Sequence, residues 1–192
     1  NGVNWKKTEL LKNGDLIACP KDISLVTENL YDDDDAYFLG MFVAEGTCNP
    51  FSISTGSNKA RDWICSYIER KFGYSPHVMI DKRRQNPVYT ILFRDKVRVI
   101  MDGLDKCKAG TKYIPEGIFL SKESIVNSFL GGYFDGDAEV SNSDISITTK
   151  SKKLATQLTY LLLRLGISSS LRDKLVNGDI FKIVRICGEG RI

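Results

Sequence analysis

Histidine is almost absent from this sequence: among 192 residues the only one is His77. A Ser-His-Asp triad and a metal site built on several histidines are therefore excluded within it, and His77 is best interpreted as an ordinary surface residue. The five cysteines stand far apart and form no Cys-x-x-Cys pair, which argues against both a zinc site and a disulfide framework. Free thiols in a reducing compartment are the simpler interpretation of Cys19, Cys48, Cys65, Cys107 and Cys187.

Long hydrophobic runs are also missing. No stretch approaches the roughly 20 apolar residues that a membrane helix needs, and the N-terminus lacks the pattern of a signal peptide. We therefore expect a cytoplasmic protein with no membrane partner. Hydrophobic residues make up 42% and charged residues 27% of the chain, as in ordinary globular proteins. Its length suits one sizeable domain, or two small ones that share a core.

The net charge of +3 is too small to identify a partner. Basic residues nevertheless cluster at 82–84, 106–112 and 150–153, and acidic residues gather at 32–35. Each run taken alone is best explained as a solvated face. Several basic clusters near expected strand ends favour a polyanionic partner such as nucleic acid.

An internal repeat organises the chain from about residue 35 onward. One offset of 92 positions relates glycine, acidic and apolar residues alike. It pairs Gly40 with Gly132, Glu45 with Asp137, Ile53 with Ile145, Tyr89 with Phe181, and Ile91 with Ile183. Because residues of such different chemistry keep the same offset, we predict two copies of one structural unit.

Each copy has the same expected order of elements. An apolar helix ends at the acidic residue, over about 35–46 and 121–137, and an alternating strand follows. A second amphipathic helix then stops at Gly73 or Gly166, as a left-handed C-cap requires. Two further strands form a hairpin, 77–82 with 88–94 and 167–174 with 180–187. A short helix closes the first copy at about 95–104, whereas the second copy is expected to be cut short at residue 192.

The two apolar helices carry small residues on one face: Gly40 and Ala44 on the first, Gly132 and Gly136 on the second. This i, i+4 spacing lets two helix backbones approach closely. If the helices pack about a pseudo-twofold axis, their terminal acids emerge side by side and repel each other unless a cation lies between them. Mg²⁺ prefers such oxygen ligands, and carboxylate-held metal suits phosphodiester hydrolysis. The alternative is a plain helix C-terminus, although an anion there opposes the helix dipole.

Two stretches carry a family signature. "FLGMFVAEG" (38–46) and "LGGYFDGDA" (130–138) resemble the two motifs of the LAGLIDADG (dodecapeptide, DOD-type) homing endonucleases. The resemblance covers roughly residues 35–187 and implies an α+β fold of two pseudosymmetric αββαββα repeats. Their two four-stranded sheets would form a β-saddle that lies in the major groove of double-stranded DNA. It also implies a monomer with internal pseudo-twofold symmetry that makes a staggered double-strand cut in a long asymmetric target.

The same resemblance implies the site residues. The last acid of each motif, Glu45 and Asp137, would coordinate Mg²⁺, with Mn²⁺ as a substitute. Glu45 stands where Asp is more usual, and Ala138 closes the second motif in place of Gly. "GTKYIPEGIF" resembles the segment that carries a lysine close to the site, so Lys112 receives a catalytic role. A phosphate contact or a solvated linker lysine is the alternative for Lys112. The second such lysine would be expected beyond Ile192.

The first thirty residues stand outside the repeat. "ELLKNGDLIACP" resembles the end of an intein splicing block, and its alternating pattern, broken by Pro20, predicts the edge of a β-rich domain. The splicing nucleophile and the terminal His-Asn of an intein are not in this sequence. We therefore expect three parts: residues 1–30 as the edge of a splicing domain, 31–114 as the first repeat and 115–192 as the second, truncated repeat.

Contacts to DNA are predicted on the strands and beside them. Phosphate contacts are assigned to Lys82, Arg83, Arg84, Lys150, Lys152 and Lys153. Strand positions that could reach bases are Ser52, Ser54, Thr90, Arg94, Ser146, Thr148, Lys182 and Arg185, although the sequence does not fix which face turns to the groove. Asp33 to Asp35 are expected to cap the first helix.

Two functions stay open from the sequence, beside a structural repeat domain without nucleic acid. The first is an intein-encoded, Mg²⁺-dependent homing endonuclease, which both acids favour. The second is a non-cleaving DNA- or RNA-binding protein on the same scaffold, such as a maturase or a transcription regulator, which the absence of the second lysine favours.

Overall fold

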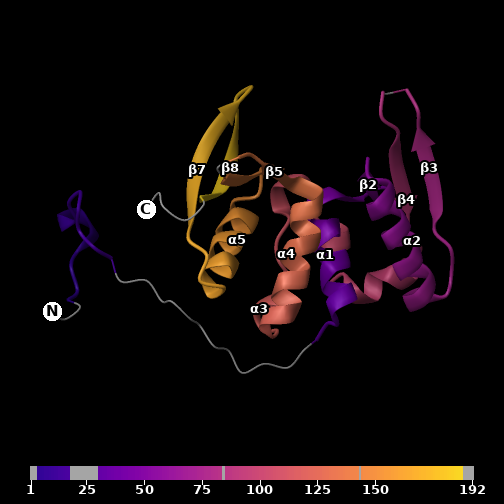
Figure 1. Ribbon diagram of the computed structural model, residues 1–192, viewed down its shortest axis with the longest axis horizontal. Helices are drawn as coiled ribbons and strands as arrows, with labels where there is room; N and C mark the ends of the chain where they lie inside the picture. Colours follow the sequence, from indigo (N-terminus) through magenta and orange to yellow (C-terminus); the bar gives the residue numbers. More distant parts are fainter. Residues whose placement is uncertain (1–3, 18–29, 84, 143, 188–192) are drawn as a thin grey trace.

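The computed structural model describes residues 4–17, 30–83, 85–142 and 144–187 (Figure 1). It confirms the α+β fold class: two four-stranded antiparallel sheets flank a central pair of helices, α1 and α4. The sheets have the strand orders β1-β2-β4-β3 and β5-β6-β8-β7. The first repeat contains α1 (Asp33–Glu45), β1 (Gly46–Cys48), β2 (Phe51–Thr55), α2 (Asn58–Phe72), β3 (His77–Asp81) and β4 (Val88–Leu92). The second contains α4 (Glu123–Asp137), β5 (Ala138–Val140), β6 (Asp144–Thr149), α5 (Lys152–Arg164), β7 (Ser169–Val176) and β8 (Asp179–Cys187).

Short turns connect the two repeats. They are the 3-10 helices η2 (Asp95–Ile100), η3 (Leu104–Lys106) and η4 (Ala109–Thr111), followed by the four-residue helix α3 (Glu116–Phe119). The single short helix expected at about 95–104 is thus two 3-10 segments. Two consecutive residues of positive φ, Asp102 and Gly103, separate these segments, and that conformation cannot continue a right-handed helix.

Local sequence signals set the ends of the longer helices. Ser57 and Ser151 accept a hydrogen bond from the backbone N–H three residues on, at the start of α2 and α5. Gly73 adopts φ 71° after α2, and Gly166 adopts φ 72° shortly after α5. Both glycines therefore stop their helices in the left-handed conformation that the sequence predicts.

The central helix pair depends on glycine. A Cβ added to Gly40 would lie 2.1 Å from the carbonyl oxygen of Phe129, and one added to Gly132 would lie 2.0 Å from the carbonyl oxygen of Tyr37. Residues 37 and 129 are 92 positions apart, as are residues 40 and 132. The two contacts are therefore the same contact made twice about a pseudo-twofold axis, and in both the backbones touch directly.

The strands do not keep the offset of 92. Gly46 pairs with Ile53 in the first sheet, whereas the corresponding Ala138 pairs with Ile147 in the second, so the offset becomes 94 at β6. On β8 it becomes 93, because Ile53 pairs with Ile91 and Ile147 pairs with Val184. Three of the equivalences predicted between the repeats are therefore wrong: Ile53 with Ile145, Tyr89 with Phe181, and Ile91 with Ile183. A longer β5–β6 turn shifts the register, which an offset fixed by the helices cannot show.

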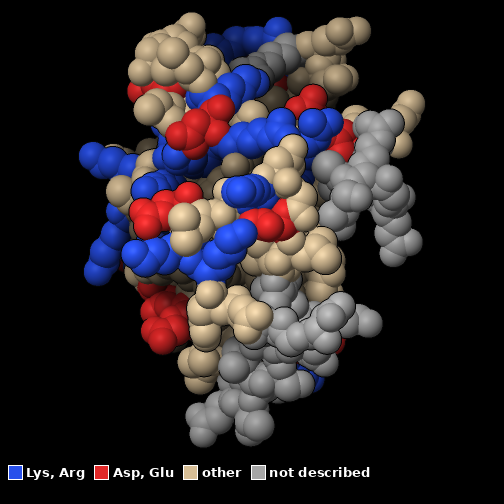
Figure 2. All heavy atoms as spheres, turned by 90° about the vertical axis from the view of Figure 1, so that its left-hand side faces the viewer, with Lys and Arg blue, Asp and Glu red and all other residues tan. Residues whose placement is uncertain are grey.

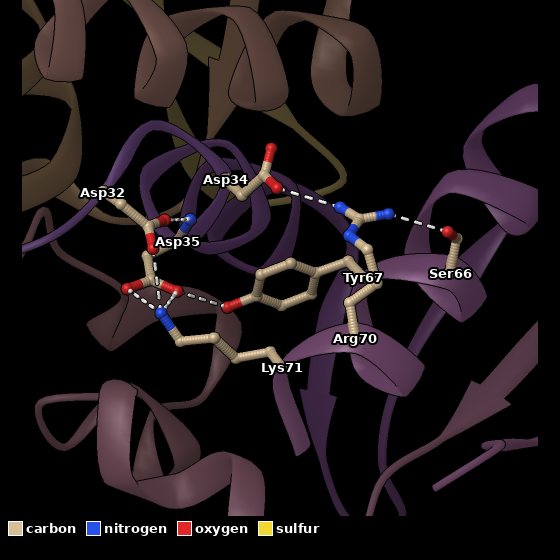
Figure 3. A network of polar contacts seen from close by, with 7 residues as sticks. All are labelled: Asp32, Asp34, Asp35, Ser66, Tyr67, Arg70 and Lys71. Atoms are coloured by element: carbon tan, nitrogen blue, oxygen red, sulfur yellow. Dashed lines mark hydrogen bonds and ion pairs between the residues drawn. The ribbon is translucent and has the colours of Figure 1, made fainter. Parts of the chain in front are cut away.

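An ion-pair network fastens α2 to the start of α1 (Figure 3). Asp35 is buried, and its carboxylate accepts hydrogen bonds from Tyr67 Oη at 2.7 Å and Lys71 Nζ at 2.9 Å. Lys71 also binds Asp32, whose side chain accepts from the Asp35 N–H. The helix cap is therefore Asp32 and not the expected Asp33 to Asp35. Burial and the neighbouring Asp35 carboxylate raise the pKa of Tyr67, which keeps its hydroxyl protonated as a donor.

The described part of the N-terminal segment, residues 4–17, differs from the β-rich expectation. It contains the 3-10 helix η1 (Thr8–Leu10) and no strand. A strand needs a neighbour for its backbone groups, and residues 4–17 pair with no strand of either sheet. Pro20 lies outside the described residues. Among the described residues, no helix is long and apolar enough to cross a membrane.

Two adjacent glycines of α4 provide a test of the helix contact. We predict that Gly132→Ala destabilises the protein by about 3 kcal/mol, because the new Cβ meets the backbone of α1 and the helices must separate. Gly131→Ala is the matched control: its Cβ would make an ordinary contact at 3.8 Å with the Tyr37 ring. Because alanine favours helix, that variant should be neutral or up to about 1 kcal/mol more stable. Urea unfolding of both variants measures the difference, and equal effects would contradict the proposed contact.

Candidate active site

The two motif acids emerge where the central helices meet. A Cβ on Gly136 would lie 2.5 Å from the Cβ of Ala44 and 3.3 Å from the Cγ of Glu45. Ala44 and Gly136 are again 92 positions apart, so they meet on the pseudo-twofold axis. Glu45 and Asp137 are the next residues and the last of their helices. The close approach thus brings one carboxylate from each repeat to the same end of the helix pair.

Both carboxylates are partly buried and difficult to ionise. Burial raises the pKa of Glu45, and the negative charge of Asp137 raises it further, while Lys112 lowers it. Burial also raises the pKa of Asp137, against the opposing effects of Lys112 and of the Tyr133 hydroxyl, which lies 3.4 Å from its Oδ2. Each acid therefore carries an electrostatic cost that a nearby positive charge would relieve.

Lys112 provides part of that charge from the connection between the repeats. Its Nζ donates to the carbonyl oxygen of Ala44 at 2.8 Å, at the negative end of the α1 dipole. Its own carbonyl oxygen accepts from Ser151 Oγ at 2.6 Å, the cap residue of α5. Burial lowers the pKa of Lys112, and the charges of Asp137 and Glu45 oppose that shift. The lysine is thus fixed by one backbone contact to each repeat.

Glu45 and Lys112 border open space, and Asp137 is partly exposed beside them. A cavity of about 500 Å³ is lined by residues 44–49 and 106–109 together with Lys112. A second opening, lined by Ser54, Asp81, Asp135 and Gly136 among others, reaches Glu45 from another side. The candidate catalytic groups are therefore accessible from solvent although they are partly buried.

The donor set suits a hard divalent ion. Within the described ranges there is no group of three or more His, Cys, Asp or Glu side chains that could enclose a metal. Two carboxylates that repel each other match the partial protein ligation typical of Mg²⁺, which keeps its remaining positions for water and phosphate oxygens. Glu45 and Asp137 are the residues that would hold such an ion.

The residues predicted to contact DNA fall into three groups. Lys82 and Arg83 lie at the β3–β4 turn, and Arg83 pairs with Asp81. Lys150, Lys152 and Lys153 lie at the start of α5, with Lys150 beside the Phe181 ring and Lys153 over the Tyr113 ring. Arg94 stacks on Tyr74 after β4. Arg84 lies outside the described residues.

Strand alternation places Lys182 and Arg185, the two candidates on β8, on opposite faces of the sheet. Val184 is fully buried against the helices, so Lys182 shares its face and Arg185 points to the opposite, open face. Lys182 pairs with Asp173 and its side chain is only 17% exposed. Ser52, although its strand position faces the open side, is 1% exposed. Arg172 and Lys174 on β7 lie on the same open face as Arg185 and are absent from the sequence-based set; alternation along 169–176 is the signal that could reveal them.

The partly buried charge of Glu45 predicts a stability difference. In EDTA at pH 7, Glu45→Gln should raise the melting temperature by about 2–4 °C, because a neutral amide removes the cost of burying the charge and the repulsion from Asp137. A raised folded pKa means that the carboxylate destabilises the fold as pH rises through its unfolded and then its folded pKa. The gain should therefore vanish near pH 4.

Glu139→Gln, at an exposed position on β5, is the control and should leave the melting temperature unchanged. Differential scanning calorimetry from pH 4 to pH 8 measures both variants. A destabilising effect of Glu45→Gln at pH 7 would contradict the electrostatic account.

The chain matches one family model and resembles segments of several larger proteins. A family model described as LAGLIDADG-like domain matches residues 124–191. The replication factor C small subunits of Methanocaldococcus jannaschii and Thermococcus kodakarensis are 33% and 31% identical, over 90% and 97% of this chain. A DNA polymerase of Thermococcus hydrothermalis is 31% identical over 72% of it. The chain spans only 10%, 21% and 8% of these three relatives.

Solved structures share the fold across both repeats. I-DmoI in complex with DNA and Mn superposes with a TM-score of 0.59 at 15% identity, covering 80% of this chain and 89% of that one. The N-terminal LAGLIDADG domain of DUF199/WhiA gives 0.56 at 15% identity, covering 81% and 76%. The family match thus covers the second repeat, and both repeats share the fold of these LAGLIDADG structures.

Proposed function

We propose that this chain is a divalent-metal-dependent, site-specific DNA endonuclease encoded within an intein. The observation that carries the proposal is the meeting of Glu45, Asp137 and Lys112 at the joint between the repeats. A scaffold that only bound DNA would have no need for two partly buried carboxylates whose charges oppose each other. The structures of I-DmoI with DNA and Mn, and with DNA and Ca, support the choice of substrate and cofactor class.

The roles of the three residues follow from their surroundings. Glu45 and Asp137 would hold a Mg²⁺ ion, which supplies positive charge at a scissile phosphate. Lys112 is held next to both acids, so its ammonium can stabilise negative charge that develops on the phosphate. Because burial lowers its pKa, it can also exchange a proton more readily than an exposed lysine.

The relatives support the intein context. The same segment matches a DNA polymerase, a small subunit of replication factor C and, at 25% identity over 85% of this chain, an A-type ATP synthase subunit of Pyrococcus abyssi. It accounts for 8%, 10% and 16% of the length of these three proteins. A segment shared by proteins of unrelated activity is best explained as an insertion that moves between host genes.

The second candidate is a DNA-binding protein that does not cut. It is favoured by the likeness to DUF199/WhiA, whose N-terminal LAGLIDADG domain has the same fold. Cleavage is the one property that separates the two candidates, because both predict binding to DNA.

The test uses a duplex that spans the uninterrupted insertion site, that is, one that joins the two host-gene sequences on either side of the whole intein. We predict a double-strand cut at the junction in Mg²⁺ and none in EDTA. Glu45→Gln and Asp137→Asn should each slow cleavage by at least about 100-fold, because each removes a charge at the reacting phosphate. Both variants should keep duplex affinity within a few-fold in Ca²⁺, measured by fluorescence anisotropy. Gel analysis of cleavage over time measures the rates.

Glu139→Gln is again the matched control and should cut at the rate of the unmodified protein. Binding to the junction without any cut or nick, over a range of enzyme and Mg²⁺ concentrations, would reject the endonuclease and leave the non-cleaving candidate. Cleavage at an unchanged rate by either acidic-site variant would remove that residue from the assignment.

A further inference from the structure

The open faces of the two sheets, which turn away from the helices, differ in the number of cations that they carry. In the first sheet, Ile53, Ile91 and Val78 face the helices. By alternation the strand positions on the open face are Thr47, Ser52, Ser54, His77, Met79, Asp81, Val88, Thr90 and Leu92. None of these is Lys or Arg, and the one formally charged residue is Asp81.

The second sheet presents cations on the corresponding face. With Ile147 and Val184 buried against the helices, the open face of β7 and β8 carries Arg172, Lys174 and Arg185, together with Asp179. The same face of β5 and β6 carries Glu139 and Asp144. Arg172 and Lys174 are exposed and form no ion pair with another described residue, while Arg185 pairs with Asp144. Lys150, which pairs with Asp179, adds a fourth cation next to the Phe181 ring, whose strand partner is Lys174. Figure 2, seen from the side of β7 and β8, shows Lys and Arg gathered in a band interspersed with acidic side chains.

The pseudo-twofold axis relates each cation of the second open face to one residue at the equivalent strand position of the first. Met79 pairs with Thr90 as Arg172 pairs with Ile183, and Asp81 pairs with Val88 as Lys174 pairs with Phe181. Ser52 likewise pairs with Leu92 where Ser146 pairs with Arg185. Each open-face cation of the second sheet therefore replaces an uncharged or acidic residue at the equivalent place in the first.

We propose that the two repeats bind DNA unequally: the second repeat anchors the duplex through Arg172, Lys174 and Arg185, and the first reads its half-site by uncharged contacts. The proposal rests on the proposed function, since it assumes that the open faces meet DNA. Positions two residues apart on a strand are separated by about 6.7 Å, close to two base-pair steps. Arg185 lies opposite Ser170, so Arg185, Arg172 and Lys174 follow one another along the hairpin toward its turn.

The chemistry of each face defines the half-site it suits. Arg and Lys recognise guanine O6 and N7 in the major groove, so the second repeat should require guanines. Ser54, Thr90 and Met79 offer hydroxyl and apolar contacts, which suit bases without that requirement, including thymine through its methyl group. Of the salt-dependent affinity that the open strand faces contribute, most should come from the second repeat, because displaced counterions scale with the cations that reach phosphates.

Two lysines of one hairpin provide a matched test. Lys174 faces the open side, and Lys182, on the neighbouring strand, faces the helices and pairs with Asp173. With a 30-base-pair duplex of mixed sequence, Lys174→Gln should reduce the slope of log K against log salt by about 0.9 if its phosphate contact is lost. Lys182→Gln should leave the slope unchanged. Fluorescence anisotropy between 50 and 300 mM KCl, about the range in which such slopes are resolved, measures both.

Base preference is tested by selection from a randomised duplex library. The unmodified protein should select guanines in one half of its target only. In Arg172→Gln the enrichment of guanine over the other bases should fall at least about fivefold at one position. Met79→Ala, at the equivalent place in the first sheet, should change no guanine preference.

The outcomes separate the two levels of the proposal. Binding to the mixed-sequence duplex with equal slopes for Lys174→Gln and Lys182→Gln, or guanine selection in both halves, would overturn the unequal division while leaving a DNA-binding function intact. No binding to any duplex would overturn the proposed function and this inference together. Circular dichroism melting of each variant verifies that the fold is kept.

Discussion

The direct backbone contact between α1 and α4 is the constraint on which the rest of the structure depends. Gly40 and Gly132 each face a carbonyl oxygen of the opposite helix, and no side chain fits between them. The contact fixes the distance between the repeats, the pseudo-twofold axis and the place where both helices end. Ala44 and Gly136 continue the same close approach. The residues that follow them, Glu45 and Asp137, therefore lie close together. The position of the acids is thus a consequence of helix packing.

That position has an electrostatic cost which the surrounding residues only partly offset. Burial and mutual repulsion raise the pKa of Glu45, and burial raises the pKa of Asp137. The nearby ammonium of Lys112 is itself buried enough for its pKa to be lowered. Groups whose charged forms are all disfavoured would be poor choices for stability alone. They are suited to a site that completes its charge balance by binding an ion and a phosphate, which is the physical basis of the proposed function.

The sequence predicts the helices of this fold better than its strands. The offset of 92 holds for Gly40 and Gly132 because the helix contact fixes both residues in space. It fails for Ile53 and Ile145 because the turn before β6 is longer, and a shift of register needs hydrogen-bond pairing to be seen. The open face is a different case: the sequence-based set groups Lys182 with Arg185, although alternation along one strand, which the sequence does show, places them on opposite sides. The proximity of Lys112 to both acids is implied only by the family resemblance, since 68 positions of chain separate it from Ala44, whose carbonyl it binds.

The two parts of each repeat are therefore under different physical constraints. The helix contact is reciprocal: a side chain at Gly40 would meet the Phe129 backbone of α4, and one at Gly132 would meet the Tyr37 backbone of α1. Both halves therefore have to keep glycine there. The open faces have no such reciprocity, since Lys174 and Asp81 lie on different sheets at equivalent places and do not pack together. Joining both repeats in one chain lets these positions differ while the helices stay alike. A symmetric joint between asymmetric faces is the arrangement that suits cutting both strands of a target whose two halves are unlike.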